Sequence, residues 1–233
     1  MDKRLTVDLT PKVHDILQNR DAYHEKYYPV DTFGGGPSLH FHRRALGLEG
    51  DVSEPDKLEL IYAVLTSWGM DRLGEKGPKM KDFDIFKTSV KLMGDDLDTL
   101  RLCSPASMTP QSWSSLQRVF QRIEVMASGT SLVGNSKVMA HLLPNIVSPI
   151  DRAYTLKYLF GNDSIQNDLN QEWELMRKIL ADFFYPIAND TVLQSTAAPW
   201  ISSQTRYPWD TSILKVVDNL VIGAMKQAGE RTP

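Results

Sequence analysis

Residues 132–151 read LVGNSKVMAHLLPNIVSPID, and this stretch carries most of the information on how the chain folds. An apolar segment with helical spacing begins after Gly134 and ends at Pro144, which cannot continue a helix. A second helix is expected to begin just beyond it, at the Ser-Pro-Ile-Asp sequence that ends in Asp151. The stretch therefore predicts two successive helices, with Lys137 in the first turn of one and Asp151 in the first turn of the next.

The turn before the first of these helices predicts an anion-binding site. Backbone N–H groups at a helix start, together with the positive end of the helix dipole, favour a phosphate. We therefore expect Gly134, Asn135 and Ser136 to bind a phosphate. The dipole also favours the neutral amine of Lys137, which is the form that attacks carbon. His141 lies four residues further on the same face, where it either contacts the substrate or packs inside the protein.

Composition and charge exclude several classes of protein. The chain has 233 residues, with 26 basic and 29 acidic side chains and a formal net charge of -3, so a nucleic-acid contact needs a local basic patch. No run of about 18 apolar residues could span a bilayer, and the first residues lack the apolar core of a signal peptide. We therefore expect a cytoplasmic protein without a membrane partner. The single cysteine, Cys103, excludes an intramolecular disulfide and a cysteine-rich zinc site, and we expect neither metal nor cofactor.

Apolar periodicity predicts an all-α fold. Apolar residues recur at helical spacing on one face in the segments 58–68, 113–127, 169–187 and 213–224. No alternating segment long enough for a useful strand is present. We expect one compact, all-helical domain over residues 1–233, in one lobe or in two. The sequence SPASMTP at 104–110 is either a boundary between lobes or an ordinary loop between helices.

Prolines and glycines mark the expected helix ends. Thr109 and Ser148 each precede a proline and are expected to cap a helix start. Gly94 and Gly161 follow apolar segments and are expected to end helices in a left-handed conformation. With Ser148 as the cap, Asp151 occupies the fourth position of a capping box, which explains its carboxylate without any catalytic role.

The same stretch resembles part of the helix-hairpin-helix DNA glycosylases, the endonuclease-III-like superfamily. The LVGNSK sequence at 132–137 resembles the hairpin of that family, and Pro-Ile-Asp at 149–151 resembles its aspartate motif. This resemblance implies a two-lobed helical fold that holds DNA through a helix-hairpin-helix, here residues 113–143, and flips a base into the cleft between the lobes. It also implies that Lys137 is a Schiff-base nucleophile and that Asp151 is the acid/base or oxocarbenium-stabilising carboxylate.

The chain also departs from that family's pattern. Of the two hairpin glycines only Gly134 is present, and the interval from Lys137 to Asp151 is shorter than usual. A protein that kept the fold and lost the base-excision chemistry would have such a sequence. Two hypotheses therefore stand: a DNA glycosylase or lyase that takes part in DNA repair, and a noncatalytic helical module that binds DNA or a protein partner.

Two further basic segments are candidates for phosphate contact. Arg43 and Arg44 follow a glycine-rich turn and a short run with two histidines. Lys76, Lys79 and Lys81 lie in a glycine-bearing loop after an expected helix, where they either meet phosphates at the mouth of the same cleft or carry ordinary solvated charges. Neither segment has the pattern of a nucleotide-binding loop.

Overall fold

The computed structural model describes residues 2–28, 36–48, 55–71, 73–74 and 77–230. Within these ranges the fold is all-α, as the apolar periodicity predicted, and β1 (Leu73–Gly74) and β2 (Gly77–Pro78) form a short antiparallel pair. None of the helices in the described part of the chain is both long and apolar enough to cross a membrane. The helices, with η marking 3-10 and π-helical segments, are η1 (Lys3–Thr6), α1 (Thr10–Tyr27), α2 (Gly36–Gly47), α3 (Pro55–Ser67), α4 (Phe83–Lys91), α5 (Gly94–Arg101), η2 (Pro105–Ser107), α6 (Pro110–Arg122), α7 (Leu132–Leu142), η3 (Arg152–Leu156), α8 (Lys157–Phe160), α9 (Leu169–Ile179), η4 (Leu180–Phe184), α10 (Tyr185–Ala188), α11 (Thr191–Ser202) and α12 (Ile213–Glu230).

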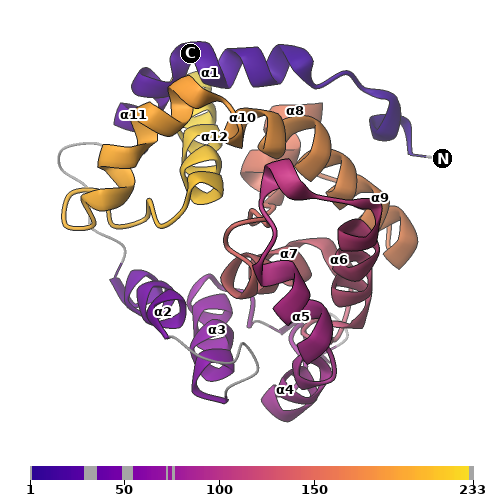
Figure 1. Cartoon of the computed structure of the whole chain (residues 1–233). Coiled ribbons are helices and arrows are strands. Elements are labelled where there is room, and N and C mark those ends of the chain that lie inside the picture. Colours follow the sequence, from indigo (N-terminus) through magenta and orange to yellow (C-terminus); the bar gives the residue numbers. More distant parts are fainter. Residues whose placement is uncertain (1, 29–35, 49–54, 72, 75–76, 231–233) are drawn as a thin grey trace.

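The first and last long helices, α1 and α12, pack against each other (Figure 1). Their close approach requires a glycine at Gly223, because a Cβ atom there would lie 2.0 Å from the carbonyl oxygen of Tyr23. Buried side chains of α12, among them Val217 and Leu220, belong to the main hydrophobic core. The packing therefore joins segments from the two ends of the chain into one unit.

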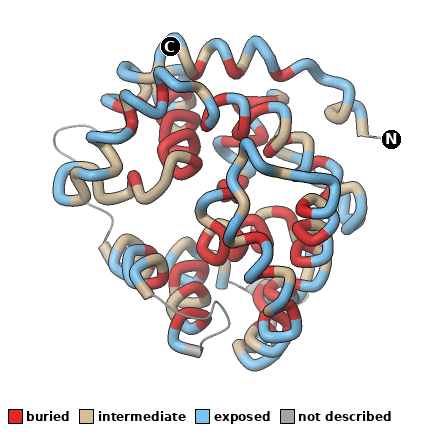
Figure 2. The backbone as a smooth tube through the Cα atoms, in the orientation of Figure 1, coloured by how far each residue is buried: buried red, intermediate tan, exposed pale blue. Residues whose placement is uncertain are grey.

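Helix α7 lies at the centre of the structure. It packs against α2, α3, α6 and α9, and most of its residues are buried (Figure 2). The backbone N–H of Leu132, at its start, donates a hydrogen bond of 2.5 Å to the buried carboxylate of Glu172 on α9. Because neighbouring helices hold α7 in place, the position of Lys137 is set by the packed core rather than by a loop.

The helix that carries Lys137 begins earlier than the sequence predicted. α7 starts before Gly134, which therefore lies inside a helix, and Lys137 lies in the second turn. The turn falls within residues 123–131, where Gly129 adopts a left-handed φ of 77°. Gly134 serves packing instead, because a Cβ atom there would lie 2.6 Å from the sulfur of Met126. The expected effect of a first-turn dipole therefore does not apply to Lys137.

The next helix begins later than predicted. Residues 143–150 form an irregular and mostly buried connection, in which Ser148 donates to the carbonyl oxygen of Leu214 (3.4 Å) instead of capping a helix. Asp151 is itself the cap of η3, since its Oδ1 accepts from the backbone N–H of Ala153 at 2.7 Å. The predicted capping box is therefore wrong in its boundary, because burial of the connection draws the serine into the core.

Other predicted boundaries are confirmed or shifted. Thr109 caps α6 by accepting from the backbone N–H of Ser112 (3.1 Å), and Gly161 ends α8 with a left-handed φ of 65°. Gly94 begins α5 instead of ending the helix before it, because the chain turns ahead of the glycine. The segment 104–110 joins α5 to α6, which pack against each other, and this favours an ordinary loop there.

Candidate functional site

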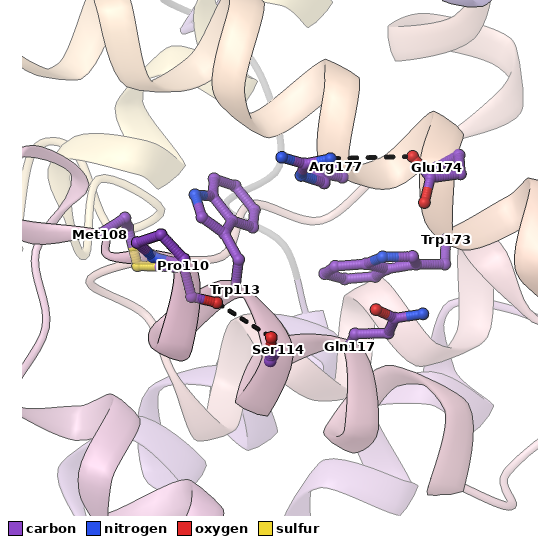
Figure 3. Close-up of a pocket in the computed structure, with 8 residues that line it drawn as sticks. All are labelled: Met108, Pro110, Trp113, Ser114, Gln117, Trp173, Glu174 and Arg177. Atoms are coloured by element: carbon purple, nitrogen blue, oxygen red, sulfur yellow. Dashed lines mark hydrogen bonds and ion pairs between the residues drawn. The ribbon is translucent and has the colours of Figure 1, made fainter.

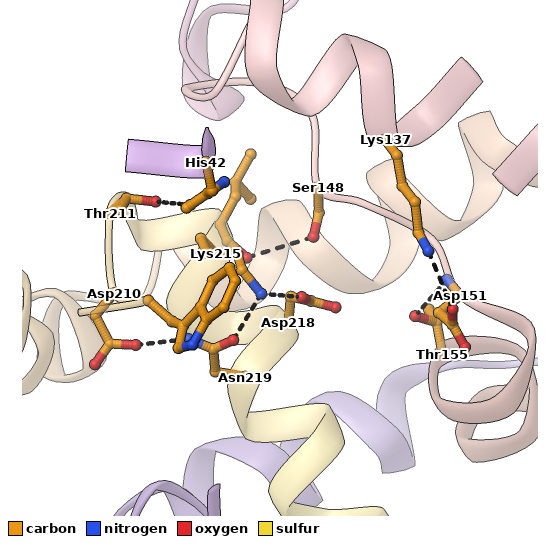
Figure 4. A network of polar contacts seen from close by, with 12 residues as sticks. His42, Lys137, Ser148, Asp151, Thr155, Asp210, Thr211, Lys215, Asp218 and Asn219 are labelled. Atoms are coloured by element: carbon orange, nitrogen blue, oxygen red, sulfur yellow. Dashed lines mark hydrogen bonds and ion pairs between the residues drawn. The ribbon is translucent and has the colours of Figure 1, made fainter. Parts of the chain in front are cut away.

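Lys137 and Asp151 face each other across a short gap (Figure 4). Lys137 Nζ lies 3.4 Å from Asp151 Oδ2, and the Lys137 side chain is only 12% exposed. The two residues come from successive elements, α7 and the residue that caps η3, and the buried connection between those elements brings them together. Because an amine at this distance can exchange a proton with a carboxylate, the pair has the geometry for acid/base chemistry.

Both residues line a central pocket of about 310 Å³ to which α1, α7, η3 and α12 contribute. This volume is at the lower end of the range for ligand sites, about 300–1,000 Å³. Four aromatic side chains also line the pocket, namely Tyr27, Trp68, Tyr154 and Trp209. The Lys137 ammonium lies 5.2 Å from the centre of the Trp68 ring, which is a cation–π distance. The pocket thus combines aromatic walls with an ion pair.

A second lysine–aspartate pair, from α12, lines the same pocket. Lys215 Nζ lies 2.6 Å from Asp218 Oδ2 and 2.7 Å from Asn219 Oδ1, and 5.8 Å from the centre of the Trp209 ring. The Asp218 side chain is 6% exposed, against 34% for Asp151. Burial raises the pKa of Asp218, and the positive charge of Lys215 opposes that rise. The α12 pair is therefore the more deeply buried of the two.

A buried chain of hydrogen bonds fixes the α12 pair in place. Asn219 Nδ2 donates to Asp210 Oδ1 at 2.7 Å, and the other oxygen of Asp210 lies 2.8 Å from His24 Nε2 on α1. The His24 ring stacks on Trp200 of α11, with 3.7 Å between the ring centres. The chain links α1, α11 and α12, so the orientation of Lys215 is preset by the fold.

Two buried histidines lie against the tryptophans of the pocket. His141 Nδ1 donates to the carbonyl oxygen of Lys137 (2.7 Å), so its Nε2 accepts from His42 Nδ1 (2.9 Å). His42 Nε2 in turn accepts from the hydroxyl of Thr211 (3.2 Å). Burial lowers the pKa of His42 to about 2 and that of His141 to about 4, so both rings are neutral near pH 7. Of its two predicted roles, the buried His141 therefore fits packing.

The hairpin residues predicted to hold a DNA phosphate are turned inward. Asn135 Nδ2 donates to a carbonyl oxygen near the end of α6 (2.8 Å), and Ser136 Oγ accepts from the backbone N–H of Ile150 (3.0 Å). Gly134 is buried as well. At the start of α7, where a phosphate was expected, the carboxylate of Glu172 accepts the backbone hydrogen bond. The structure thus fills this anion position with one of the protein's own side chains.

The two basic segments differ in how far they are exposed. Arg43 and Arg44 are exposed on α2, and Arg43 lines a hollow that it shares with the loop after α7. Lys81 forms an ion pair with a glutamate in the loop after α6, and Lys79 is half-buried. Lys76 lies outside the described residues. The arginines of α2 are therefore the most accessible of the predicted basic residues that the structure describes.

Lys215 and Asp218 of the α12 pair were not among the residues predicted from the sequence. The signal for Lys215 and Asp218 was present, because two opposite charges three residues apart interrupt an otherwise apolar helix. For Trp68 and Trp209 only their meeting in one pocket was unpredictable, since they are far apart in sequence and packing brings their ring centres to 6.5 Å from each other.

A larger cavity of about 470 Å³ lies between α6 and α9 (Figure 3). Trp113 and Trp173 line it, and the Arg177 guanidinium lies 5.7 Å from the centre of the Trp113 ring. Arg177 pairs with Glu174 at 3.9 Å, and both of these side chains are about half exposed. The cavity has aromatic walls without a buried acid/base pair among its lining residues, so the central pocket is the better candidate for chemistry.

No cluster of three or more histidine, cysteine, aspartate or glutamate side chains within the described ranges could hold a metal ion. Comparisons with known proteins found no matching family model, curated protein or solved structure. The function of the central pocket is therefore argued from its own residues and their contacts.

Proposed function

We propose that this protein acts on DNA as a glycosylase or lyase, with Lys137 as the nucleophile and Asp151 as the group that exchanges a proton with it. The observation that carries the proposal is the 3.4 Å separation of Lys137 Nζ and Asp151 Oδ2 in a pocket with aromatic walls. Attack on a sugar carbon beside a bound base needs an amine, a proton acceptor and a site for a flat ring. The central pocket supplies all three.

The two oxygens of Asp151 have separate tasks in the proposed reaction. Oδ1 stays bound to the backbone N–H of Ala153 and fixes the carboxylate. Oδ2 takes a proton from Lys137 Nζ, and the amine attacks C1′ of the deoxyribose. The bond from C1′ to the base breaks, and the base leaves with the electron pair and takes up a proton. A second proton then passes from the nitrogen to the ring oxygen O4′ as the C1′–O4′ bond breaks, O4′ keeps the electron pair of that bond, and the nitrogen lone pair forms the protonated Schiff base.

The walls of the pocket support a nucleobase as the bound group. Trp68 and Trp209 offer π-faces, and stacking of a base on an aromatic side chain contributes about 1–3 kcal/mol. A base inside a duplex is out of reach of such a pocket, so the nucleotide must be flipped out of the helix before reaction. The modest volume favours a single ring system over a longer segment of nucleic acid.

A noncatalytic module that binds DNA or a protein is the second candidate, and one observation favours it. The hairpin side chains Asn135 and Ser136 are buried, and Glu172 occupies the anion position at the start of α7. The hairpin grip that the family resemblance implied is therefore weakened. DNA would have to be held elsewhere, and the exposed Arg43 and Arg44 of α2 are the candidates for that role.

Base release and borohydride trapping, measured together, test the enzymatic proposal. Duplexes carrying uracil, hypoxanthine, 8-oxoguanine or an abasic site are incubated with excess protein. We expect base release from at least one duplex, and an adduct that Lys137→Ala abolishes. Lys157→Ala is the matched control, because Lys157 forms an ion pair of the same 3.4 Å length with Asp163 on the surface.

The outcomes separate the two candidates. If no duplex loses a base and none is trapped, the enzymatic proposal is wrong and the noncatalytic module is retained. If a base is released without an adduct, the glycosylase assignment stands and the covalent role of Lys137 is wrong. If Lys157→Ala removes the adduct as fully as Lys137→Ala does, the reaction does not belong to the central pocket.

A further inference from the structure

The Asp218 side chain is mostly buried, and one of its carboxylate oxygens accepts no hydrogen bond from the described residues. Its Oδ2 is bound to Lys215 Nζ at 2.6 Å, whereas its Oδ1 accepts no hydrogen bond from any residue that the structure describes. Only 6% of the side chain is exposed, and it lines the central pocket. In Figure 4 it points from α12 toward the side on which Lys137 and Asp151 lie. Unlike Asn135 Oδ1, which is buried without a partner, Asp218 Oδ1 is open to the pocket, where a donor from a ligand can reach it.

Lys215 offers the complementary group beside it. An ammonium group has three N–H donors, and two of them are directed to Asp218 and to Asn219 Oδ1 at 2.7 Å. The third donor is available to a ligand. The side chain is held by these two acceptors, so the donor is oriented before any ligand arrives. The α12 pair therefore presents one donor and one acceptor, side by side, to the occupant of the pocket.

We infer that Lys215 and Asp218 read the pairing edge of the flipped base, and that the pocket selects bases whose pairing N–H and neighbouring acceptor are unmodified. This inference rests on the proposed function, because it takes the occupant of the pocket to be a nucleobase. Lys137 and Asp151 act on the sugar of the flipped nucleotide, and the pair on α12 contacts its base. The pairing edge of uracil or hypoxanthine carries a ring N–H beside a carbonyl oxygen. These two groups match the acceptor of Asp218 and the donor of Lys215.

The inference excludes a defined class of substrate. A methyl group on the pairing nitrogen removes the N–H that would donate a hydrogen bond to Asp218, and it places a carbon atom against the carboxylate. Bases alkylated at that nitrogen are therefore rejected. Bases oxidised elsewhere on the ring keep the edge that the pair reads, and deamination of cytosine or adenine creates it. Rejection arises because a methylated base that fills the pocket covers the carboxylate without donating a hydrogen bond to it.

The test compares the binding of a base with that of its N-methyl derivative. The probes are duplexes in which a 2′-fluoro nucleotide, whose bond to the base resists cleavage, carries hypoxanthine or 1-methylhypoxanthine, and uracil or 3-methyluracil. Each probe base lies opposite a tetrahydrofuran spacer, which cannot form a Schiff base, so that base pairing does not affect flipping. Fluorescence anisotropy gives the dissociation constants. We expect the wild-type protein to bind each methylated probe about tenfold more weakly, or worse.

Two variants test whether Asp218 causes the preference for the unmethylated probes. Asp218→Asn keeps the shape and removes the charged acceptor, and we expect it to discriminate less than about threefold. Asp163→Asn, at the exposed Lys157–Asp163 pair, is the matched control and should discriminate as the wild type does. Thermal unfolding shows whether Asp218→Asn is folded, and if it is not, the comparison of the probes on the wild-type protein decides alone.

Equal binding of the methylated and unmethylated probes overturns the inference. So does binding of the probes no tighter than that of a duplex that carries the spacer and no probe base. The proposed function fails separately: discrimination without base release or trapping on natural duplexes leaves the pocket as a reader of bases and removes its catalytic role. Base release without discrimination leaves the catalytic role and shows that the α12 pair only holds the helices together.

Discussion

Lys137 Nζ lies 3.4 Å from one oxygen of the Asp151 carboxylate, while the other oxygen caps the helical turn η3. A single side chain therefore connects the fold to the proposed chemistry. The cap fixes the direction of the carboxylate, and that direction points its second oxygen at the amine. The two roles can be separated, because a cap needs only an oxygen acceptor and a proton acceptor of this kind needs a carboxylate.

Replacing Asp151 by asparagine should separate these roles. Asparagine caps helices about as well as aspartate, so we expect Asp151→Asn to leave the free energy of unfolding within about 0.5 kcal/mol of the wild type. Base release should fall by about a hundredfold, because the proton acceptor is lost. Asp151→Ala should lose the activity and about 1 kcal/mol of stability. Urea denaturation and single-turnover assays measure the two effects, and full activity in Asp151→Asn would leave the residue as a cap only.

Gly223 allows the contact between α1 and α12, and both of these helices supply residues to the pocket. A Cβ atom at Gly223 would lie 2.0 Å from the carbonyl oxygen of Tyr23, which is backbone and cannot rotate away. We expect Gly223→Ala to destabilise the protein by about 3 kcal/mol. Gly229→Ala is the control on the same helix, since nothing lies within 4 Å of its added Cβ, and it should be neutral or slightly stabilising. Equal stability of the two variants would contradict the close packing.

The buried histidine pair should make the protein less stable as the pH falls. Burial lowers the pKa of His42 to about 2 and that of His141 to about 4, below the unfolded value of about 6.5. Between these values the unfolded chain binds protons that the folded chain does not, so the free energy of unfolding decreases as the pH falls. We expect a loss of roughly 2 kcal/mol per histidine between about pH 7 and pH 5, measured by urea denaturation.

Two variants assign this pH dependence to the pair. His42→Gln removes one of the two titrating groups and should reduce the dependence by about half. His14→Gln, at an exposed position of α1, is the control and should leave it unchanged. If His42→Gln shows the same pH dependence as the wild type, the histidine pair does not produce it.

Replacing Arg43 tests whether the exposed face of α2 binds the DNA backbone. Removal of one phosphate contact weakens binding to all sequences alike and lowers the slope of log K against log salt concentration by about 1. We expect this change for Arg43→Ala in anisotropy titrations at several salt concentrations. Arg122→Ala, at an exposed position of α6, should leave the slope unchanged, because α6 supplies no residue to the central pocket. If Arg43→Ala has the same slope of log K against log salt concentration as the wild type, Arg43 does not contact the DNA.

The class of fold was predictable because it depends on local patterns. The apolar spacing over 169–187 predicted one long helix, and the structure has continuous helical turns from Leu169 to Ala188. Caps such as Thr109 act within one turn, so their signal is also local. Gly134 was misplaced because a glycine in sequence fits either a turn or a close contact. Only the tertiary structure shows Met126 against it.

The central pocket was predictable only in part. Lys137 and Asp151 are close in sequence, and the short connection between them limited how far apart they could lie. Trp209 and Lys215 come from a distant part of the chain, and they reach the pocket through the packing of α12. The charges of α12 stand out in the sequence, but no spacing in the sequence shows that α12 packs beside Lys137 and Asp151.

The most direct test of the proposed role of Lys137 is to identify the lysine that reacts. The protein is trapped with borohydride on a duplex that contains an abasic site, and the cross-linked peptide is sequenced by mass spectrometry. We predict that the adduct lies on Lys137, and that Lys215, held by two acceptors in the same pocket, is unmodified. An adduct on Lys215 or on a surface lysine such as Lys157, with none on Lys137, would contradict it.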